Sequence, residues 1–127
     1  MNRQVAPAHL APPAANYAHA MLSIGATRWL HTSGVVATRS DGSVPDDLAE
    51  QASVIWANLL AMLNDSSMSV TDVVSVTTYV VVGNDLSVVM AARDRIMGDH
   101  RAASTLVPVP ALAQPKWKME IAIIAAA

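Results

Sequence analysis

The chain of 127 residues contains no cysteine and no phenylalanine, and these absences exclude several kinds of chemistry. Without cysteine there can be no disulfide, no thiolate nucleophile and no cysteine-based zinc site. The four histidines are not spaced as metal ligands, and the five glycines form no phosphate-binding loop. We therefore expect neither a metal ion nor a cofactor.

Charge is also scarce, at 14% of residues with a formal net charge of −2. Lysine and arginine are scattered, whereas a nucleic-acid-binding protein carries a basic stripe, and three tryptophans with two tyrosines offer few stacking platforms. No apolar run approaches the roughly 20 residues that span a bilayer, and the first residues do not resemble a signal peptide. The sequence thus predicts a cytoplasmic protein that binds neither nucleic acid nor membranes.

Apolar residues, in contrast, make up 53% of the chain. A chain of this length forms one domain, here residues 1–127, with a high ratio of surface to volume. Such a domain cannot bury all of its apolar side chains by itself, so we expect a homo-oligomer.

The first third of the chain predicts an extended lead-in and two short strands. Residues 1–15 hold three prolines among many alanines and read as poorly ordered. Residues 17–24 and 27–33 are strand candidates, joined by a hairpin turn at Gly25 and Ala26. Residues 39–43 form a loop by their turn chemistry.

Two helices and three further strands follow. Asp47 with Glu50 predicts a helix start, and the helix should end near residues 64–67. Its expected apolar face consists of Leu48, Ala52, Ile55, Leu59 and Met62. Residues 73–82 are rich in β-branched side chains and predict a central strand. Asp85 and Gly98 bound a second helix, and residues 105–109 and 117–125 are the last strands.

This order of elements predicts an α+β fold, with a single mixed sheet of about five to six strands and two helices packed on one face. The other face of the sheet alternates valine with threonine and would be bare in a monomer. It is a second, independent argument for an oligomer.

Six short motifs occur in a characteristic order. They are residues 16–20 (NYAHA), 32–34 (TSG), 41–44 (DGSV), 50–59 (EQ through NL), 100–105 (HRAAST) and 118–123 (KMEIAI). Together they resemble the Rid/YjgF family of reactive intermediate deaminases, over about residues 13–125. The resemblance implies a homotrimer whose sheets line the centre, with a cleft at each subunit boundary that takes a small-molecule metabolite and needs no cofactor.

Glu120 is an acidic side chain in an otherwise apolar strand, which is costly unless it is paired, hydrogen-bonded or facing water. The resemblance implies that Glu120 holds and activates a water that attacks a C=N carbon. The alternative is a solvated edge residue, or a partner for Lys116 or Lys118 of a neighbouring copy.

The resemblance also assigns substrate-binding roles elsewhere. Tyr17 would close the cleft, Ser33 and Gly34 would offer a hydroxyl and a backbone N–H, and Thr105 would present its amide to a carboxylate. Each has a purely structural alternative: a packed amphipathic tyrosine, a glycine in a tight backbone path, or an ordinary strand residue.

Ala103 is the main departure from the family pattern. Members with deaminase activity carry an arginine directly before the Ser-Thr step, where its fork holds a substrate carboxylate by two hydrogen bonds. Alanine offers no donor. Arg101 lies two residues upstream, about 6–7 Å along an extended strand. It is either a partial substitute or a cap on the second helix beside His100.

We favour a hydrolase acting on C=N bonds, an imine or enamine deaminase that acts weakly on small 2-iminoacids. The alternative is a non-catalytic homotrimer that binds a small metabolite in the same cleft, and a purely structural homotrimer is a third reading. Some members of the family have been described as ribonucleases. The composition of this chain gives a ribonuclease activity little support.

Overall fold

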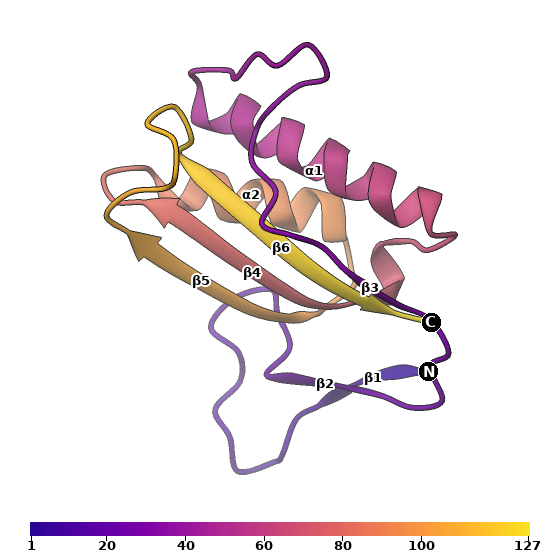
Figure 1. Ribbon diagram of the computed structural model, residues 1–127. Coiled ribbons are helices and arrows are strands. Elements are labelled where there is room, and N and C mark those ends of the chain that lie inside the picture. The colour runs from indigo at the N-terminus through magenta and orange to yellow at the C-terminus, as the bar shows by residue number, and fades with distance from the viewer.

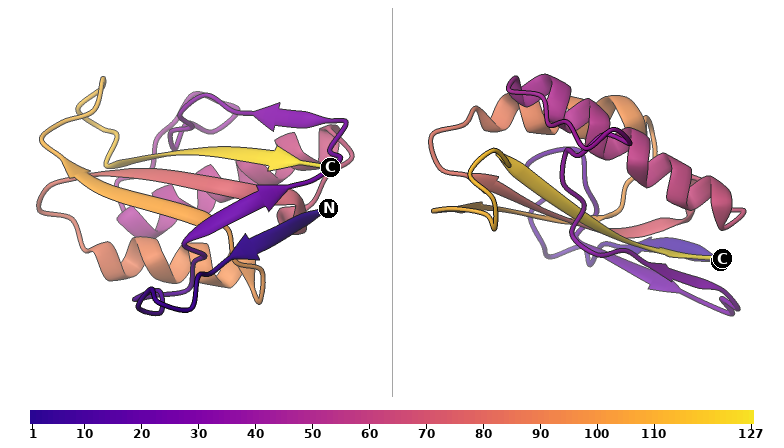
Figure 2. Two further views of the ribbon diagram at one scale, coloured as in Figure 1. Left: turned by 90° about the horizontal axis from the view of Figure 1, so that it is seen from below. Right: turned by 45° about the horizontal axis from the view of Figure 1, so that its top comes forward.

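A computed structural model describes all 127 residues and consists of a helical layer above a layer of strands (Figure 1). The elements follow the order β1 (Asn2–Val5), β2 (Ala20–Ser23), β3 (Trp29–His31), α1 (Leu48–Asp65), the 3-10 turn η1 (Val70–Asp72), β4 (Val73–Val81), α2 (Leu86–Met97), β5 (Ala103–Val109) and β6 (Met119–Ala126). The α+β architecture and the placing of both helices on one face confirm the prediction (Figure 2).

The main sheet has the strand order β3-β6-β4-β5 and is mixed, as predicted. Strand β4 runs parallel to β5 and antiparallel to β6, and β6 is antiparallel to β3. Helix α2 provides the crossover between the parallel strands β4 and β5, as such a connection requires.

The N-terminal part differs from the sequence prediction. The lead-in contains strand β1, which pairs with β2 in a separate two-stranded sheet, so the strands form two sheets instead of one. The predicted hairpin at Gly25 is wrong, because β2 pairs with β1 and β3 pairs with β6. Thr27 and Arg28 donate their amides to Ala127, which starts the chain along β6. The sequence did not reveal β1, because residues 2–5 have no alternating apolar pattern and their partner strand β2 follows only after a long loop.

Helix α1 begins as predicted, with the Asp47 carboxylate accepting from the amide of Glu50 at 3.0 Å. It ends at Asp65, also as predicted. Its buried apolar face consists of Ala52, Ile55, Trp56, Leu59 and Leu63. Met62 was wrongly assigned to this face: it is 39% exposed, because Leu63 is four residues after Leu59 and takes the inward position.

Helix α2 is capped at both ends as predicted. The Asp85 carboxylate accepts from the hydroxyl and the amide of Ser87, and these two hydrogen bonds hold the pKa of Asp85 below its usual range. The stabilisation is therefore present above the unfolded-state pKa and is lost as pH falls through the folded-state pKa. Gly98 ends the helix with a φ of 56°.

The two faces of the main sheet are chemically different. The side chains of Val76, Val80, Met119, Ile121 and Ile123 face the helices and are at most 1% exposed. We call the opposite side the open face. It carries Ser75, Thr77, Tyr79, Ala103, Thr105, Val107, Glu120, Ala122 and Ile124, by strand alternation. On it or at its rim, Val107 is 40% and Trp29 53% exposed, so the structure leaves large apolar side chains unburied there.

Candidate functional site

Glu120 lies on the open face of β6, in register with Tyr79 of β4. Its neighbours Met119 and Ile121 point into the core, as the alternation of side chains along a strand requires. The side chain is half-buried. The strand thus holds a single carboxylate at the surface of an otherwise apolar sheet.

Gly34 lies directly beneath this carboxylate. An added Cβ at Gly34 would overlap the Glu120 carboxylate and lie 2.8 Å from its Cγ. Paired hydrogen bonds between Val35 and Ile121, at 2.7 and 3.0 Å, hold the two segments together. Gly34 does not have a positive φ, so what the position requires of glycine is space for Glu120.

Polar groups around the carboxylate remain without partners inside the chain. Glu120 makes no hydrogen bond or ion pair, and neither the amides of Ser33 and Gly34 nor the Ser33 hydroxyl is hydrogen-bonded. Lys118 is directed instead to the carbonyl of Asp46. The half-buried carboxylate and the exposed donors of Ser33 and Gly34 are therefore all available to a water or a polar ligand.

The remaining predicted residues gather at the β5 edge of the main sheet. Ala103 and Thr105 lie on the open face of the edge strand β5. The amide of Ala18 donates to the Ala102 carbonyl at 2.9 Å, and this contact brings the half-buried Tyr17 to the start of β5. The Tyr17 hydroxyl accepts from the amide of Ala14 at 3.4 Å, and the Tyr17 ring meets His19 edge-on at 6.2 Å.

The two groups are too far apart to share one ligand within a chain. Across the sheet, Ala103 is opposite Ser75 of β4, which is opposite Ile124 of β6. The separation from Glu120 is therefore two strand spacings, about 10 Å, and four residues along β6, about 13 Å. The structure brings Glu120 together with Ser33 and Gly34. These two spacings combine to about 16 Å between Ala103 and Glu120. Thr105 is opposite Thr77, which is opposite Ala122, so it lies about 12 Å from Glu120.

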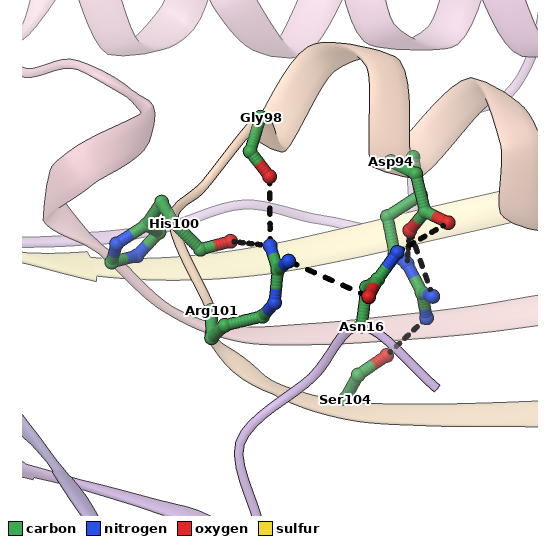
Figure 3. Close-up of polar contacts among 7 residues, drawn as sticks. Asn16, Asp94, Gly98, His100, Arg101 and Ser104 are labelled. Carbon is green, nitrogen blue, oxygen red and sulfur yellow. Dashed lines mark hydrogen bonds and ion pairs between the residues drawn. The ribbon is translucent and has the colours of Figure 1, made fainter. Parts of the chain in front are cut away.

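Arg101 is held at the end of α2, where the capping interpretation predicted it (Figure 3). Its guanidinium donates to the carbonyls of Gly98 at 2.7 Å and His100 at 3.2 Å, and to the side chain of Asn16 at 3.4 Å. These contacts occupy the guanidinium, so Arg101 does not present a free fork to a ligand.

A second arginine near Ala103 was missed as a candidate by sequence reasoning. Arg93, on the inner face of α2, is only 8% exposed. Its guanidinium donates twice to Asp94, at 3.1 and 3.0 Å, and to the Ser104 hydroxyl at 3.4 Å. The sequence did offer a signal, since Arg93 is a charged residue on the apolar face of a predicted helix. Only the structure shows that it lies beside β5, the strand that lacks the expected arginine.

The cavities of the chain lie elsewhere. One, of about 510 Å³, is lined by Thr38, Gly42, Ser43, Val44, Gln114, Lys116 and Trp117. Another, of about 350 Å³, also borders Gln114 and Trp117, in the connection between β5 and β6. Neither cavity is lined by a predicted site residue. On the single chain, the predicted site residues therefore lie on open surface and not in a cavity. No cluster of three or more acidic or histidine side chains could hold a metal ion. No helix is both long and apolar enough to cross a membrane.

Comparison with known proteins identifies the family of the chain. The family model described as endoribonuclease L-PSP matches residues 8–127. The chain belongs to this family, the Rid/YjgF family. No curated protein matches the chain significantly.

Solved structures of Rid/YjgF proteins superpose on nearly the whole chain. The Rid family protein YyfB from Yersinia pestis is 28% identical, with a TM-score of 0.85 over 99% of this chain and 98% of its own. A putative endoribonuclease from Thermotoga maritima is 27% identical, with a TM-score of 0.73 over 100% and 98%. The YjgF gene product of E. coli is 29% identical, with a TM-score of 0.71 over 87% of both chains.

Proposed function

We propose that this Rid/YjgF protein is a hydrolase acting on C=N bonds, an imine or enamine deaminase in which Glu120 positions the attacking water. The observation that carries the proposal is the unpaired Glu120 carboxylate over Gly34, beside the free donors of Ser33 and Gly34. A carboxylate in this setting can orient a water and accept its proton as the oxygen adds to the protonated C=N carbon. The adduct then collapses to a carbonyl compound and ammonia.

A second copy of the chain would complete the site. Because Glu120 and the Tyr17–Ala103 group are two strands apart on the open face, both can contact one small ligand only if Glu120 of one copy faces the β5 edge of another copy. The exposed apolar side chains of the open face favour the same arrangement. The proposed assembly is the homotrimer typical of the family.

The homotrimer predicts a solution mass of about three times the chain mass of 13.4 kDa. Burying the open face stabilises the assembly by roughly 25 cal/mol per Å² of apolar area. Sedimentation equilibrium over a wide range of concentrations measures this mass. A monomer at every concentration would contradict both the assembly and the shared cleft.

The β5 side of the proposed cleft offers no free guanidinium. Ala103 provides no donor, and the two neighbouring arginines are engaged, Arg101 with carbonyls of the α2 end and Arg93 with Asp94. A substrate carboxylate would therefore find no free arginine there. The proposed substrates are imines or enamines that need no carboxylate clamp.

The test is ammonia release from two freshly generated substrates, 2-iminopropanoate and a neutral imine made from a primary amine by an amine oxidase. Glu120→Ala should lower the turnover rate of the neutral imine at least a hundredfold, because the attacking water loses the group that accepts its proton. Turnover of 2-iminopropanoate should be at least a hundredfold below that of an arginine-bearing relative. That factor corresponds to the loss of about 3 kcal/mol from a bidentate contact.

Ala103→Arg is the matched gain-of-function variant and should raise turnover of 2-iminopropanoate alone. Turnover that survives in Glu120→Ala would contradict the proposed mechanism. Saturable binding of imines without any turnover would favour the alternative function, a metabolite-binding homotrimer. The net charge of −2 gives the ribonuclease activity in the family description little support.

A further inference from the structure

The loop that carries Tyr17, residues 6–19 between β1 and β2, is attached to the rest of the chain by few polar contacts. Most of its hydrogen bonds are internal, such as those of His19 with the Ala11 carbonyl and of Ala14 with the Tyr17 hydroxyl. Three hydrogen bonds leave the loop: one from the amide of Ala18 to Ala102 and two at the side chain of Asn16.

The Asn16 amide bridges two charged residues of the α2 end (Figure 3). Its Nδ2 donates to Asp94 at 3.1 Å, and its Oδ1 accepts from the Arg101 guanidinium at 3.4 Å. One side chain therefore uses both its donor and its acceptor to hold the residue that precedes Tyr17.

Both partners of Asn16 are themselves held in place. Asp94 receives two hydrogen bonds from the buried Arg93, which also reaches Ser104 of β5. Arg101 is fixed by the carbonyls of Gly98 and His100. Because each partner is held by further hydrogen bonds of its own, the pair can anchor the loop to the end of α2.

We infer that Arg101 is a positioning residue, which acts with Asn16 and Asp94 to hold Tyr17 at the start of β5 beside Ala103. It is not a ligand for the substrate carboxylate. The inference rests on the proposed function only in giving Tyr17 a place in the cleft; the anchor itself is a property of the single chain. Arg101, which lies near Ala103, would thus hold the loop of residues 6–19 over the ligand.

The experiment uses the two tyrosines of the chain, Tyr17 and Tyr79. Protein made with 3-fluorotyrosine gives two ¹⁹F resonances, which Tyr17→Phe assigns. In Asn16→Ala and in Arg101→Ala, the Tyr17 resonance should shift towards its unfolded position while the Tyr79 resonance remains. The amide of Ala18 should exchange with solvent about tenfold faster, since the loop loses hydrogen bonds worth about that factor.

Arg95→Ala is the matched control, because Arg95 is an exposed arginine in the last turn of the same helix and its side chain makes no hydrogen bond or ion pair. It should change neither resonance. Arg101→Lys covers the risk that loss of the helix cap unfolds α2: lysine can still reach the Gly98 carbonyl but lacks the fork that also holds Asn16. It should release Tyr17 partly. An unchanged Tyr17 resonance and Ala18 exchange rate in Asn16→Ala and Arg101→Lys would overturn the inference.

The imine assay adds a readout that separates positioning from ligand binding. If Arg101 positions Tyr17, Asn16→Ala and Arg101→Ala reduce kcat/KM by similar factors for carboxylated and neutral imines, and the double variant loses little more. If Arg101 binds the carboxylate, only Arg101→Ala raises KM, and only for 2-iminopropanoate, which would refute the inference. Should no imine be turned over, the proposed function fails while the ¹⁹F and exchange measurements still decide on the anchor.

Discussion

Replacing Gly34 with alanine is expected to reduce imine turnover at least a hundredfold, as much as removing the Glu120 carboxylate. The new Cβ would occupy the space of that carboxylate and lie 2.8 Å from Glu120 Cγ. Because Glu120 is flexible and half-buried, it can swing aside at a cost of about 0.5–1.5 kcal/mol instead of unfolding the strand. The melting temperature should therefore fall by only a few degrees.

The matched test places Gly34→Ala in a Glu120→Ala background. There the overlapping atoms are gone, so the alanine at position 34 should no longer lower the melting temperature. Turnover should be equally low in the two single variants and in the double variant, since all three lack a positioned carboxylate. Wild-type turnover in Gly34→Ala would show that the close approach to Glu120 has no part in the reaction.

Gln51→Leu is expected to have the largest effect on stability. Gln51 is fully buried in α1, and its amide donates to the carbonyls of Pro45 and Lys116 at 2.8 Å and accepts from the amide of Lys118 at 2.9 Å. Leucine keeps most of the volume but leaves these three backbone groups without their partner. An unpaired buried group costs about 1–3 kcal/mol, and the groups of Lys116 and Lys118 are only part-buried, so the free energy of unfolding should fall by about 3–5 kcal/mol. The melting temperature should fall by 10 °C or more, on the order expected for a domain of this size.

Thermal and urea unfolding measure this loss, and Gln114→Leu is the control. Gln114 is exposed, and its side chain makes no hydrogen bond, so the same exchange there should change the melting temperature by less than about 2 °C. Equal melting temperatures for Gln51→Leu and the wild type would mean that the three bonds contribute nothing net. Since Lys118 begins the segment that leads to Glu120, loss of Gln51 should also loosen the candidate site.

The helices were predictable because their signals are local. Asp47 and Asp85 cap the helices within three residues of the groups they bond, and Gly98 ends α2 by its own backbone conformation. The pairing of β1 with β2 was not predictable, because its hydrogen bonds join residues separated by a long loop, and the strand residues 2–5 carry no periodic pattern.

The candidate site divides in the same way. The sequence by itself determined that Glu120 points away from the core, since a strand alternates its faces and the neighbours Met119 and Ile121 are apolar. The resemblance further predicts that Ala103 stands in the place of an arginine that would bind a substrate carboxylate, and this stays a prediction. Only the tertiary structure placed Gly34 beneath Glu120, set Glu120 and Ala103 two strands apart in the sheet, and tied Asn16 to Arg101. Those contacts join residues up to 86 positions apart, and no local propensity encodes which distant segments meet when the core packs.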